Sequence, residues 1–494
     1  MQENATGRTG PRVGPLAGGP DGPFSGPLDG GPDGPLSGPL AGPLAGIRVA
    51  DFSRVLAGPY ATMMLADFGA DVIKIESPAG DDTRQWRPPV DAQGDSTYFG
   101  SVNRNKRGIV CDFTTEAGLA EASRLAASAD VVIENFRPGV MAKFGLDYDS
   151  VRAVNPGVVY CSITGFGSGA GAALPGYDLL VQAVGGLMSV TGQPDAEPSK
   201  VGVALVDVLT GQNALAGILL ALRDRDGSAA NSAANSAANS TVNSAAGAGR
   251  LVEVDLLTTL LSALTNLAAG TLATGETPAR LGNAHASIAP YELFQALDRD
   301  LVIAVGNDRQ FRTLMRLLGS PEGADDERFS SNSARVAHRA VLRERINGLL
   351  AVQPAAHWVG ILTDAGVPAG LVNSIDEAFA FAAELGLEAA VELRADEVRA
   401  EVSRADGLRA ETRTPRISRQ VANPIHLSGL PADYRLLPPR LGEHAGADWL
   451  ARPATPPATP PATPPATPPA TPPATDSPVA PLPRPATPPR EGTP

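Results

Sequence analysis

The sequence predicts an α/β protein with a large parallel-sheet domain and a smaller α/β domain. Short apolar strands alternate with helices between residues 46 and 163, and a second, shorter alternation occurs between residues 291 and 374. About 400 residues remain once the compositionally biased segments are set aside, which is enough for two domains with sizeable cores.

The elements of the large domain follow one another in a regular order. We expect strands at residues 47–52, 71–76, 108–112, 130–134, 158–163 and 251–255, and helices at 58–69, 116–128, 148–154, 177–186, 210–224 and 256–270. Pro59 suits the first turn of the first helix, and Gly69 suits its end. This order predicts a Rossmann-like sheet that binds its ligand at the carboxyl ends of the strands. In the second alternation we expect a strand at 301–305 and a helix at 309–318.

Three segments have too little apolar surface to form a core. Residues 1–45 are rich in Gly and Pro, and residues 451–494 are rich in Pro, Ala and Thr, so we expect two disordered tails. Residues 227–249 repeat Ala, Asn and Ser, and we interpret them as a flexible insertion in a surface loop. The large domain then comprises residues 46–226 and 375–450, and residues 250–374 form a linker helix and the small domain.

Composition excludes several classes of function. The 494 residues carry 40 basic and 53 acidic side chains, a net charge of −13 that disfavours binding to nucleic acid or to an anionic membrane. No apolar run reaches the ~18 residues of a membrane span, and the N-terminus lacks the pattern of a signal peptide. Cys111 and Cys161 lie in apolar strands and are expected to be buried free thiols. We therefore expect a cytoplasmic protein.

Histidine placement argues against metal and triad chemistry. All five histidines lie beyond residue 280, so residues 46–280 contain neither a local Ser-His or Cys-His pair nor a histidine metal cluster, and no metal is expected. Residues 165–170 match Gly-x-Gly-x-x-Ala, but Pro175 and Gly176 interrupt the helix that a dinucleotide site requires. We interpret this segment as a flexible loop over an active site.

Two polar segments are candidates for binding phosphate. Residues 103–108, Asn-Arg-Asn-Lys-Arg-Gly, precede one strand, and residues 135–139, Asn-Phe-Arg-Pro-Gly, follow another. Taken alone, the first is more simply a solvated basic loop. Taken together, they suggest neighbouring loops at strand carboxyl ends, where phosphates and adenine rings commonly bind.

Asp207 is the candidate catalytic residue. It is an acid in the otherwise apolar run 201–211, and a buried carboxylate must be paired, hydrogen-bonded or used in chemistry. It could act as a nucleophile. The alternative is a structural one, in which an acid near a helix N-terminus stabilises the helix that follows.

The ordered motifs of residues 44–450 resemble the family III CoA-transferases (CaiB/BaiF type), which include formyl-CoA transferase, carnitine CoA-transferase and alpha-methylacyl-CoA racemase. The motifs are Asp51-Phe52-Ser53, Ala57-Gly58-Pro59, residues 69–76, Asn105-Lys106-Arg107, residues 134–139, Tyr177-Asp178, Asp207, Thr210-Gly211, Asn423-Pro424-Ile425 and residues 441–444. Found together and in this order, they are highly specific.

The resemblance implies a function and a set of site residues. Asp207 would attack an acyl-CoA, and CoA would pass through aspartyl esters to a carboxylic acid, with no cofactor beyond the CoA thioester substrate. The implied CoA-binding residues are Val55, Leu56, Ala57, Cys111, Asp112, Phe113, Thr114, Asn135, Phe136, Arg137, Lys143 and Tyr177. Ser77 stands where formyl-CoA transferase has a basic residue, and the Gly-rich lid of that enzyme is replaced by residues 282–291. The family also implies an interlocked homodimer.

Two alternatives stay open at this point. A racemase needs a His–Asp pair, because a proton leaves one face of the α-carbon and returns on the other. Asp178 matches the racemase aspartate, but the histidine position falls near Tyr148-Asp149, which contains no histidine, and the second acid falls near Gln295. The other alternative is a CoA-binding interaction protein without catalytic activity.

Overall fold

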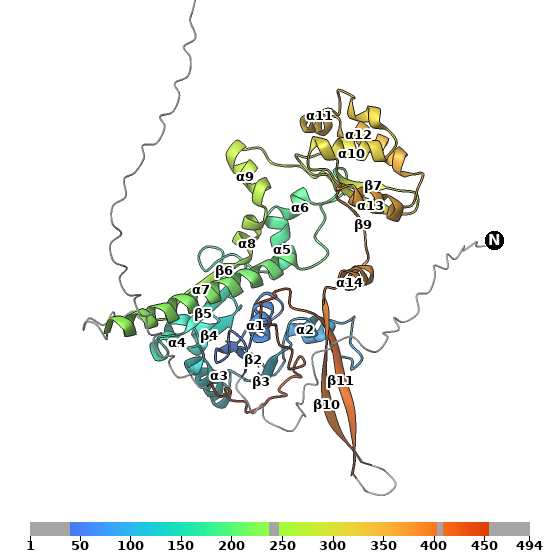
Figure 1. Cartoon of the computed structure of the whole chain (residues 1–494). Helices are drawn as coiled ribbons and strands as arrows, with labels where there is room; N and C mark the ends of the chain where they lie inside the picture. The colour runs from blue at the N-terminus through green and yellow to red at the C-terminus, as the bar shows by residue number, and fades with distance from the viewer. Residues whose placement is uncertain (1–39, 237–246, 403–408, 454–494) are drawn as a thin grey trace, which may run out of the picture. The chain divides into compact units, whose positions relative to one another are not determined.

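The computed structural model describes residues 40–236, 247–402 and 409–453 (Figure 1). Most of the two expected tails, and residues 237–246 of the expected insertion, lie outside these ranges. Both tail boundaries move by a few residues. Leu44 packs against the core of the large domain, and Arg452 forms a 2.9 Å ion pair with Asp130. Residues 40–45 and 451–453 therefore continue the folded chain.

The large domain is built on a six-stranded parallel sheet (Figure 1). Its strand order is β3-β2-β1-β4-β5-β6, which is the Rossmann order and confirms the predicted fold class. The strands are β1 Arg48–Asp51, β2 Asp71–Glu76, β3 Lys106–Val110, β4 Val131–Glu134, β5 Val159–Thr164 and β6 Leu251–Asp255.

Helices cover both faces of the sheet because successive strand residues point to opposite faces. Val49 and Val72 pack with α1 (Ala57–Asp67), α5 (Asp178–Val184), α7 (Leu205–Ser236) and α8 (Leu256–Ala263). Ala50 and Ile73 pack with α3 (Glu116–Ser128) and α4 (Tyr148–Val154) on the other face. Burial of both faces explains why these strands are apolar throughout.

The remaining elements are shorter or belong to the small domain. The short helices of the large domain are η1 Asp82–Gln85, α2 Thr97–Gly100, η2 Met141–Phe144 and α6 Leu187–Val190. The small domain has an antiparallel sheet of β7 Tyr291–Gln295, β8 Asp300–Ala304 and β9 Ala369–Leu371, with helices α10 Asp308–Leu317, η3 Pro321–Ala324, α11 Asn332–Ala337, α12 Arg339–Leu350 and α13 Ala355–Asp364. It has a hydrophobic core of its own.

The chain beyond residue 374 forms a helix and a hairpin and then packs on the large domain. These elements are α14 Ile375–Glu384 and the antiparallel strands β10 Ala390–Val402 and β11 Arg409–Val421. The irregular segment that follows hydrogen-bonds to the sheet, because the His444 N–H donates to the Gly108 carbonyl at 2.9 Å and the Leu450 N–H donates to Asp71 at 2.8 Å.

Two helices differ from the prediction. α7 starts at Leu205 rather than residue 210 and continues to Ser236, so the first ten residues of the expected insertion are helical; alanine-rich repeats favour helix. The helix expected at 256–270 is two helices, α8 and α9 (Thr265–Thr274), bent by 85°. Thr265 has a φ of 41°, outside the helical region, and so marks the break.

α7 is a core helix of the large domain. Its stretch Leu205–Ser228 is long and apolar enough to cross a membrane, so the expectation that no such stretch exists was wrong. However, Val206, Ala214 and Ile218 are fully buried in the same cluster as the sheet residues. The apolar character of this helix is explained by its packing.

Candidate active site

The strand order changes direction between β1 and β4, and the two loops that leave these strands are joined by Asn135. The Arg54 N–H donates to the Asn135 side-chain oxygen at 2.8 Å, and the Asn135 side-chain N–H donates to the Arg54 carbonyl at 2.7 Å. The switch point of such a sheet is where ligands bind. The structure therefore brings the predicted segments 55–57 and 135–137 to the same edge.

A cleft of about 220 Å³ opens at this edge. Aromatic and aliphatic side chains form most of its wall, with a few polar groups between them, as in sites for cofactor-sized ligands. The lining residues are Phe52, Arg54, Ile75, Glu76, Ser77, Gly80, Asp81, Cys111, Asp112, Phe113, Thr114, Phe136, Val140, Met141 and Phe144.

Only part of the predicted CoA-binding set lines this cleft. Cys111, Asp112, Phe113, Thr114 and Phe136 belong to the wall. The others lie beside it or elsewhere. Val55, Leu56 and Ala57 form the turn into α1, and Asn135 joins the two loops. Arg137 and Lys143 are outside the lining, and Tyr177 precedes α5 with 63% of its surface exposed.

Arg54 is the main residue that the sequence prediction missed. It is the only basic side chain among the described residues that line the cleft. Its guanidinium lies 5.2 Å from the centre of the Phe136 ring and 3.2 Å from Asp82. Arg54 directly precedes the predicted residues 55–57, and this position could have identified it as a candidate for binding the ligand. A cation in an aromatic cleft suits a ligand that carries both phosphate and a planar ring.

Asp207 lies in the first turn of α7, where Asp178 caps the helix. One Asp178 oxygen accepts the N–H groups of Val206 at 2.8 Å and Asp207 at 3.2 Å, and the other accepts the Gln182 side-chain N–H at 2.5 Å. Burial and the neighbouring charge of Asp178 raise the pKa of Asp207 to about 7. Asp207 forms no ion pair within the ranges that the structure covers, so its carboxylate remains available for chemistry.

The face of α7 that carries Asp207 meets the start of α1. Gly211 follows Asp207 by four residues and so lies on the same face of α7. A Cβ at position 211 would lie only 2.5 Å from the Ala57 carbonyl oxygen, so glycine is needed where α7 meets the start of α1. Burial and the charges of Asp207, Asp178 and Asp81 raise the pKa of Tyr98 to about 12.

The basic segment 103–107 does not bind phosphate at the carboxyl edge, and this prediction was wrong. Its side chains are buried and form ion pairs: Arg104 with Asp67 at 2.6 Å, Lys106 with Asp51 at 3.1 Å and Arg107 with Asp71 at 2.6 Å. Lys106 and Arg107 are the first two residues of β3, and the rest of the segment precedes it, so the segment lies at the amino end of a parallel strand, opposite the ligand edge.

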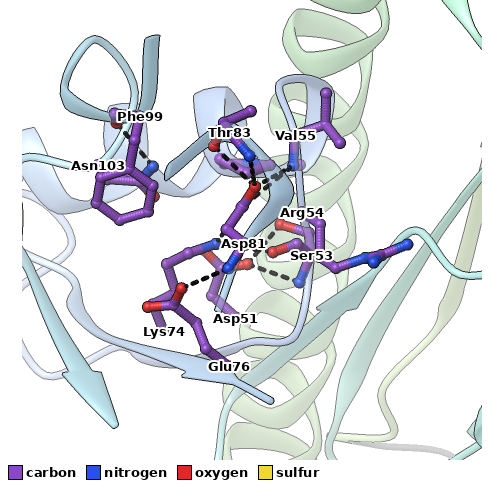
Figure 2. A network of polar contacts seen from close by, with 12 residues as sticks. Asp51, Ser53, Arg54, Val55, Lys74, Glu76, Asp81, Thr83, Phe99 and Asn103 are labelled. Carbon is purple, nitrogen blue, oxygen red and sulfur yellow. Dashed lines mark hydrogen bonds and ion pairs between the residues drawn. The ribbon is translucent and has the colours of Figure 1, made fainter. Parts of the chain in front are cut away.

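A buried ionic network lies beside the cleft (Figure 2). Lys74 contacts Asp81 at 3.0 Å, and Glu76 accepts the Asp81 N–H at 2.9 Å and pairs with Arg84. Burial raises the pKa of Asp81, but the Lys74 ammonium and the Thr83 hydrogen bonds lower it by more. The net result is a lowered pKa, so Asp81 stays ionised. Burial likewise lowers the pKa of Lys74, but the charges of Asp81, Asp51 and Glu76 raise it.

Other predicted features have structural explanations. The segment that begins at Gly165 is a turn in which Gly165 and Gly176 pack closely, and no helix starts there. Cys111 and Cys161 are buried free thiols, and burial raises the pKa of Cys111 to about 11. Among the described residues, no three His, Cys, Asp or Glu side chains converge as metal ligands.

The arrangement at Asp178 differs from what a racemase needs. Both oxygens of Asp178 accept hydrogen bonds that fix the start of α7 and the side chain of Gln182. Tyr148, at the expected histidine position, packs its ring 6.0 Å from that of Tyr160 within the domain core. Asp178 therefore has a structural role at the start of α7.

Comparison with known proteins agrees with this geometry. The sequence profile of CoA-transferase family III matches residues 44–445. The chain is 42% identical over 426 residues to succinate–glutarate CoA-transferase of Agrobacterium fabrum, covering 84% of this chain and 98% of that protein. It is 39% identical over 339 residues to mouse succinyl-CoA:glutarate CoA-transferase, covering 68% and 73%. Both relatives are named for CoA transfer between an acyl-CoA and an acid.

A solved structure extends the match to the fold. The crystal structure of a CAIB/BAIF family protein from Brucella suis superposes with a TM-score of 0.67 at 39% identity, covering 82% of this chain and 97% of that one. Sequence motifs, strand order and relatives agree. The chain belongs to CoA-transferase family III.

Proposed function

We propose that this CoA-transferase works through covalent esters of Asp207. The observation that carries the proposal is the position of Asp207. It lies in the first turn of a helix, without a cation partner in the described chain, and on the helix face that meets the Val55–Ala57 turn. A carboxylate with no ion pair is less stabilised than a paired one, and it is correspondingly more reactive as a nucleophile.

The cleft is proposed to hold the nucleotide end of CoA. Phe113, Phe136 and Phe144 offer apolar surface for the adenine ring, and Arg54 offers the cation that the phosphates need. The pantetheine arm would then run along the Val55–Ala57 turn, so that the thioester reaches Asp207 one helical turn from Gly211. Arg54 would also replace the basic residue that is absent at Ser77.

The proposed reaction has four balanced displacements. An Asp207 oxygen attacks the donor thioester carbon, which releases CoA thiolate and leaves an aspartyl–acyl anhydride. The thiolate attacks the aspartyl carbonyl, which releases the donor acid and leaves an aspartyl–CoA thioester. The acceptor carboxylate then displaces CoA thiolate to form a second anhydride. Finally, the thiolate attacks the acceptor acyl carbon and restores the free Asp207 carboxylate.

Short dicarboxylic acids are the proposed acids. Relatives at 42%, 40% and 35% identity are named for succinate and glutarate, for acetyl-CoA and oxalate, and for succinyl-CoA and mesaconate. Four of these acids carry two carboxylates. A panel with succinyl-CoA as donor and glutarate, oxalate, mesaconate or acetate as acceptor, read by mass spectrometry, would rank them. We expect the dicarboxylates to exceed acetate.

Trapping tests the covalent proposal directly. Enzyme incubated with donor acyl-CoA and no acceptor should accumulate an Asp207 ester, which hydroxylamine converts to a hydroxamate in the tryptic peptide of residues 201–223. Asp207→Asn is the matched control and should give no label. Transfer without any label in the native enzyme would instead indicate direct acyl transfer in a ternary complex, and the proposal would fail.

We also propose that the enzyme is a homodimer. Apolar side chains remain exposed on the α7 and α9 helices, with Leu220 72% and Leu272 88% exposed in the single chain. A second copy would cover such side chains, as the family resemblance implies. Light scattering after size exclusion should give twice the 50.6 kDa chain mass, and a monomer at micromolar concentration would reject this proposal.

A further inference from the structure

The turn between β1 and α1 contains a residue in an unfavourable backbone conformation. Val55 has a φ of 67°, in the left-handed region. A β-branched side chain is disfavoured there because its Cβ approaches the backbone, and such conformations persist only when the surroundings enforce them. Val55 directly follows Arg54 of the cleft and directly precedes the N-cap Leu56 of α1.

Asp81 is the group that enforces this conformation (Figure 2). Its carboxylate is buried, and it accepts the Val55 N–H at 3.3 Å through one oxygen and 3.2 Å through the other. The Thr83 N–H and hydroxyl donate to the first oxygen at 3.0 and 2.7 Å. The Lys74 ammonium donates to the second oxygen at 3.0 Å. Asp81 therefore has a fixed orientation when it receives the Val55 amide.

Lys74 ties the same turn to the sheet from the other side. Its ammonium, which is fully buried, also donates to the Ser53 carbonyl at 2.9 Å. Asn135 binds both the N–H and the carbonyl of Arg54. The Ser53 carbonyl, both backbone groups of Arg54 and the Val55 N–H thus have partners on β2, on the loop after β4 and on Asp81. This turn is held in place before any ligand binds.

We propose that Asp81 is a positioning residue that holds the Arg54–Val55 turn in the conformation that binds the CoA thioester. The inference rests on the proposed placement of CoA in the cleft. It adds a role for a buried acid of the cleft wall that takes no part in proton transfer or nucleophilic attack. Without Asp81, part of the binding energy must be used to return Val55 to the left-handed region, so ligand affinity falls.

Asp81 is also the N-cap of η1, where its side chain accepts the Thr83 N–H, and Asp81→Asn separates the two roles. With its oxygen toward Thr83, the Asn side chain keeps both Thr83 hydrogen bonds. Its NH2 group then faces two donors, the Lys74 ammonium and the Val55 N–H, so the contacts at 3.0 and 3.2 Å are lost and Val55 keeps only the 3.3 Å contact to the oxygen beside Thr83. We expect the Kd for CoA, measured by calorimetry, and the KM for succinyl-CoA to rise about tenfold. We expect kcat at saturating donor to change less than threefold.

Asp71→Asn is the matched control. Asp71 also forms a buried ion pair, with Arg107 at 2.6 and 2.8 Å, but it begins β2 at the amino edge, away from the cleft. Both variants should lower the melting temperature, and only Asp81→Asn should weaken CoA binding. Equal effects of the two substitutions on Kd, or a Kd for Asp81→Asn within twofold of the native enzyme, would overturn the proposal.

A second substitution tests the mechanism. Glycine adopts a φ of 67° without strain, so Val55→Gly added to Asp81→Asn should recover at least half of the lost affinity in logarithmic terms. If Asp81→Asn does not fold, hydrogen exchange of the native enzyme replaces it. The Val55 amide should be protected before CoA is added, and free exchange until CoA binds would refute the role of Asp81.

These outcomes are distinct from failure of the proposed function. A native enzyme that does not bind CoA, or that gives no Asp207 hydroxamate, would reject the proposed function itself. A native enzyme that binds and transfers CoA, with an Asp81→Asn variant that binds equally well, would reject only the inference about Asp81.

Discussion

Asp81, which is buried, and Asp207, which is partly buried, are two carboxylates with opposite environments. Asp81 receives a buried ammonium group, two backbone amides and a hydroxyl group, and these contacts lower its pKa. Asp207 lies beside a second carboxylate, Asp178, and its pKa rises to about 7. The charges of both acids raise the pKa of the same tyrosine, Tyr98.

The comparison shows how the partners of an acid determine its role. A fully paired carboxylate is held ionised and fixes the geometry of its neighbours, whereas an unpaired one retains reactivity at the expense of stability. Asp81 belongs to the first kind and Asp207 to the second. Removing the cation beside Asp81 should therefore raise its pKa, and removing the acid beside Asp207 should lower the pKa of Asp207.

The largest expected effect is the loss of transfer in Asp207→Asn. An amide cannot form the anhydride, so kcat should fall by at least about 10⁴-fold, or about 5.5 kcal/mol in activation free energy. CoA affinity should stay within about threefold, since the cleft is unchanged. The measurement is steady-state transfer by mass spectrometry, together with calorimetry for CoA. Transfer within tenfold of the native rate would remove Asp207 from the mechanism.

Removing a cation from the paired region should destabilise the fold most. Lys106→Met leaves Asp51 buried without its 3.1 Å ion-pair partner, and it leaves the Asn103 side-chain oxygen without a donor. We expect the free energy of unfolding to fall by roughly 3–5 kcal/mol, measured by urea denaturation. Lys200→Met, at an exposed position, is the control and should change it by less than about 0.5 kcal/mol. Similar values for both would show that the pair contributes little.

The pH dependence of kcat/KM should follow the ionisation of Asp207, the unpaired acid. Because the nucleophile must be ionised and the pKa of Asp207 is about 7, kcat/KM should fall about tenfold per pH unit below that value. In Asp178→Asn the neighbouring charge is absent, so the acid limb should move to lower pH. A profile that is flat from pH 5 to 8, or a limb that Asp178→Asn leaves in place, would contradict this assignment.

The smallest expected effect is a gain in stability. A carboxyl group whose folded pKa is raised destabilises the folded state above that pKa, and the penalty declines as pH falls toward the unfolded value of 3.8. After allowance for partial exposure and for the helix N-terminus, Asp207→Asn should add roughly 1 kcal/mol to the free energy of unfolding at pH 8. The gain should disappear near pH 4. A loss of stability at pH 8 would mean that Asp207 supports the fold.

The sequence by itself determined the features that depend on local pattern. The strand β2 at residues 71–76 and the helix α3 at residues 116–128 match the prediction in both bounds. Apolar runs and the glycine at the end of α1 are signals that act within a few residues. The family motifs, with Asp207 among them, could likewise be identified from the sequence, because their order along the chain is specific to the family.

Only the tertiary structure decided which charges meet. Sequence reasoning assigned Lys106 and its neighbours to a phosphate-binding loop, but parallel strand pairing places Lys106 opposite Val72 and within 3.1 Å of Asp51. No local pattern predicts the contacts of Asp81, because its partners Val55 and Lys74 come from other elements. Ion pairing and burial depend on strand register and on the approach of distant segments. The approach of distant segments also decides that Asp81 has a cation partner, Lys74, and that Asp207 has none among the described residues.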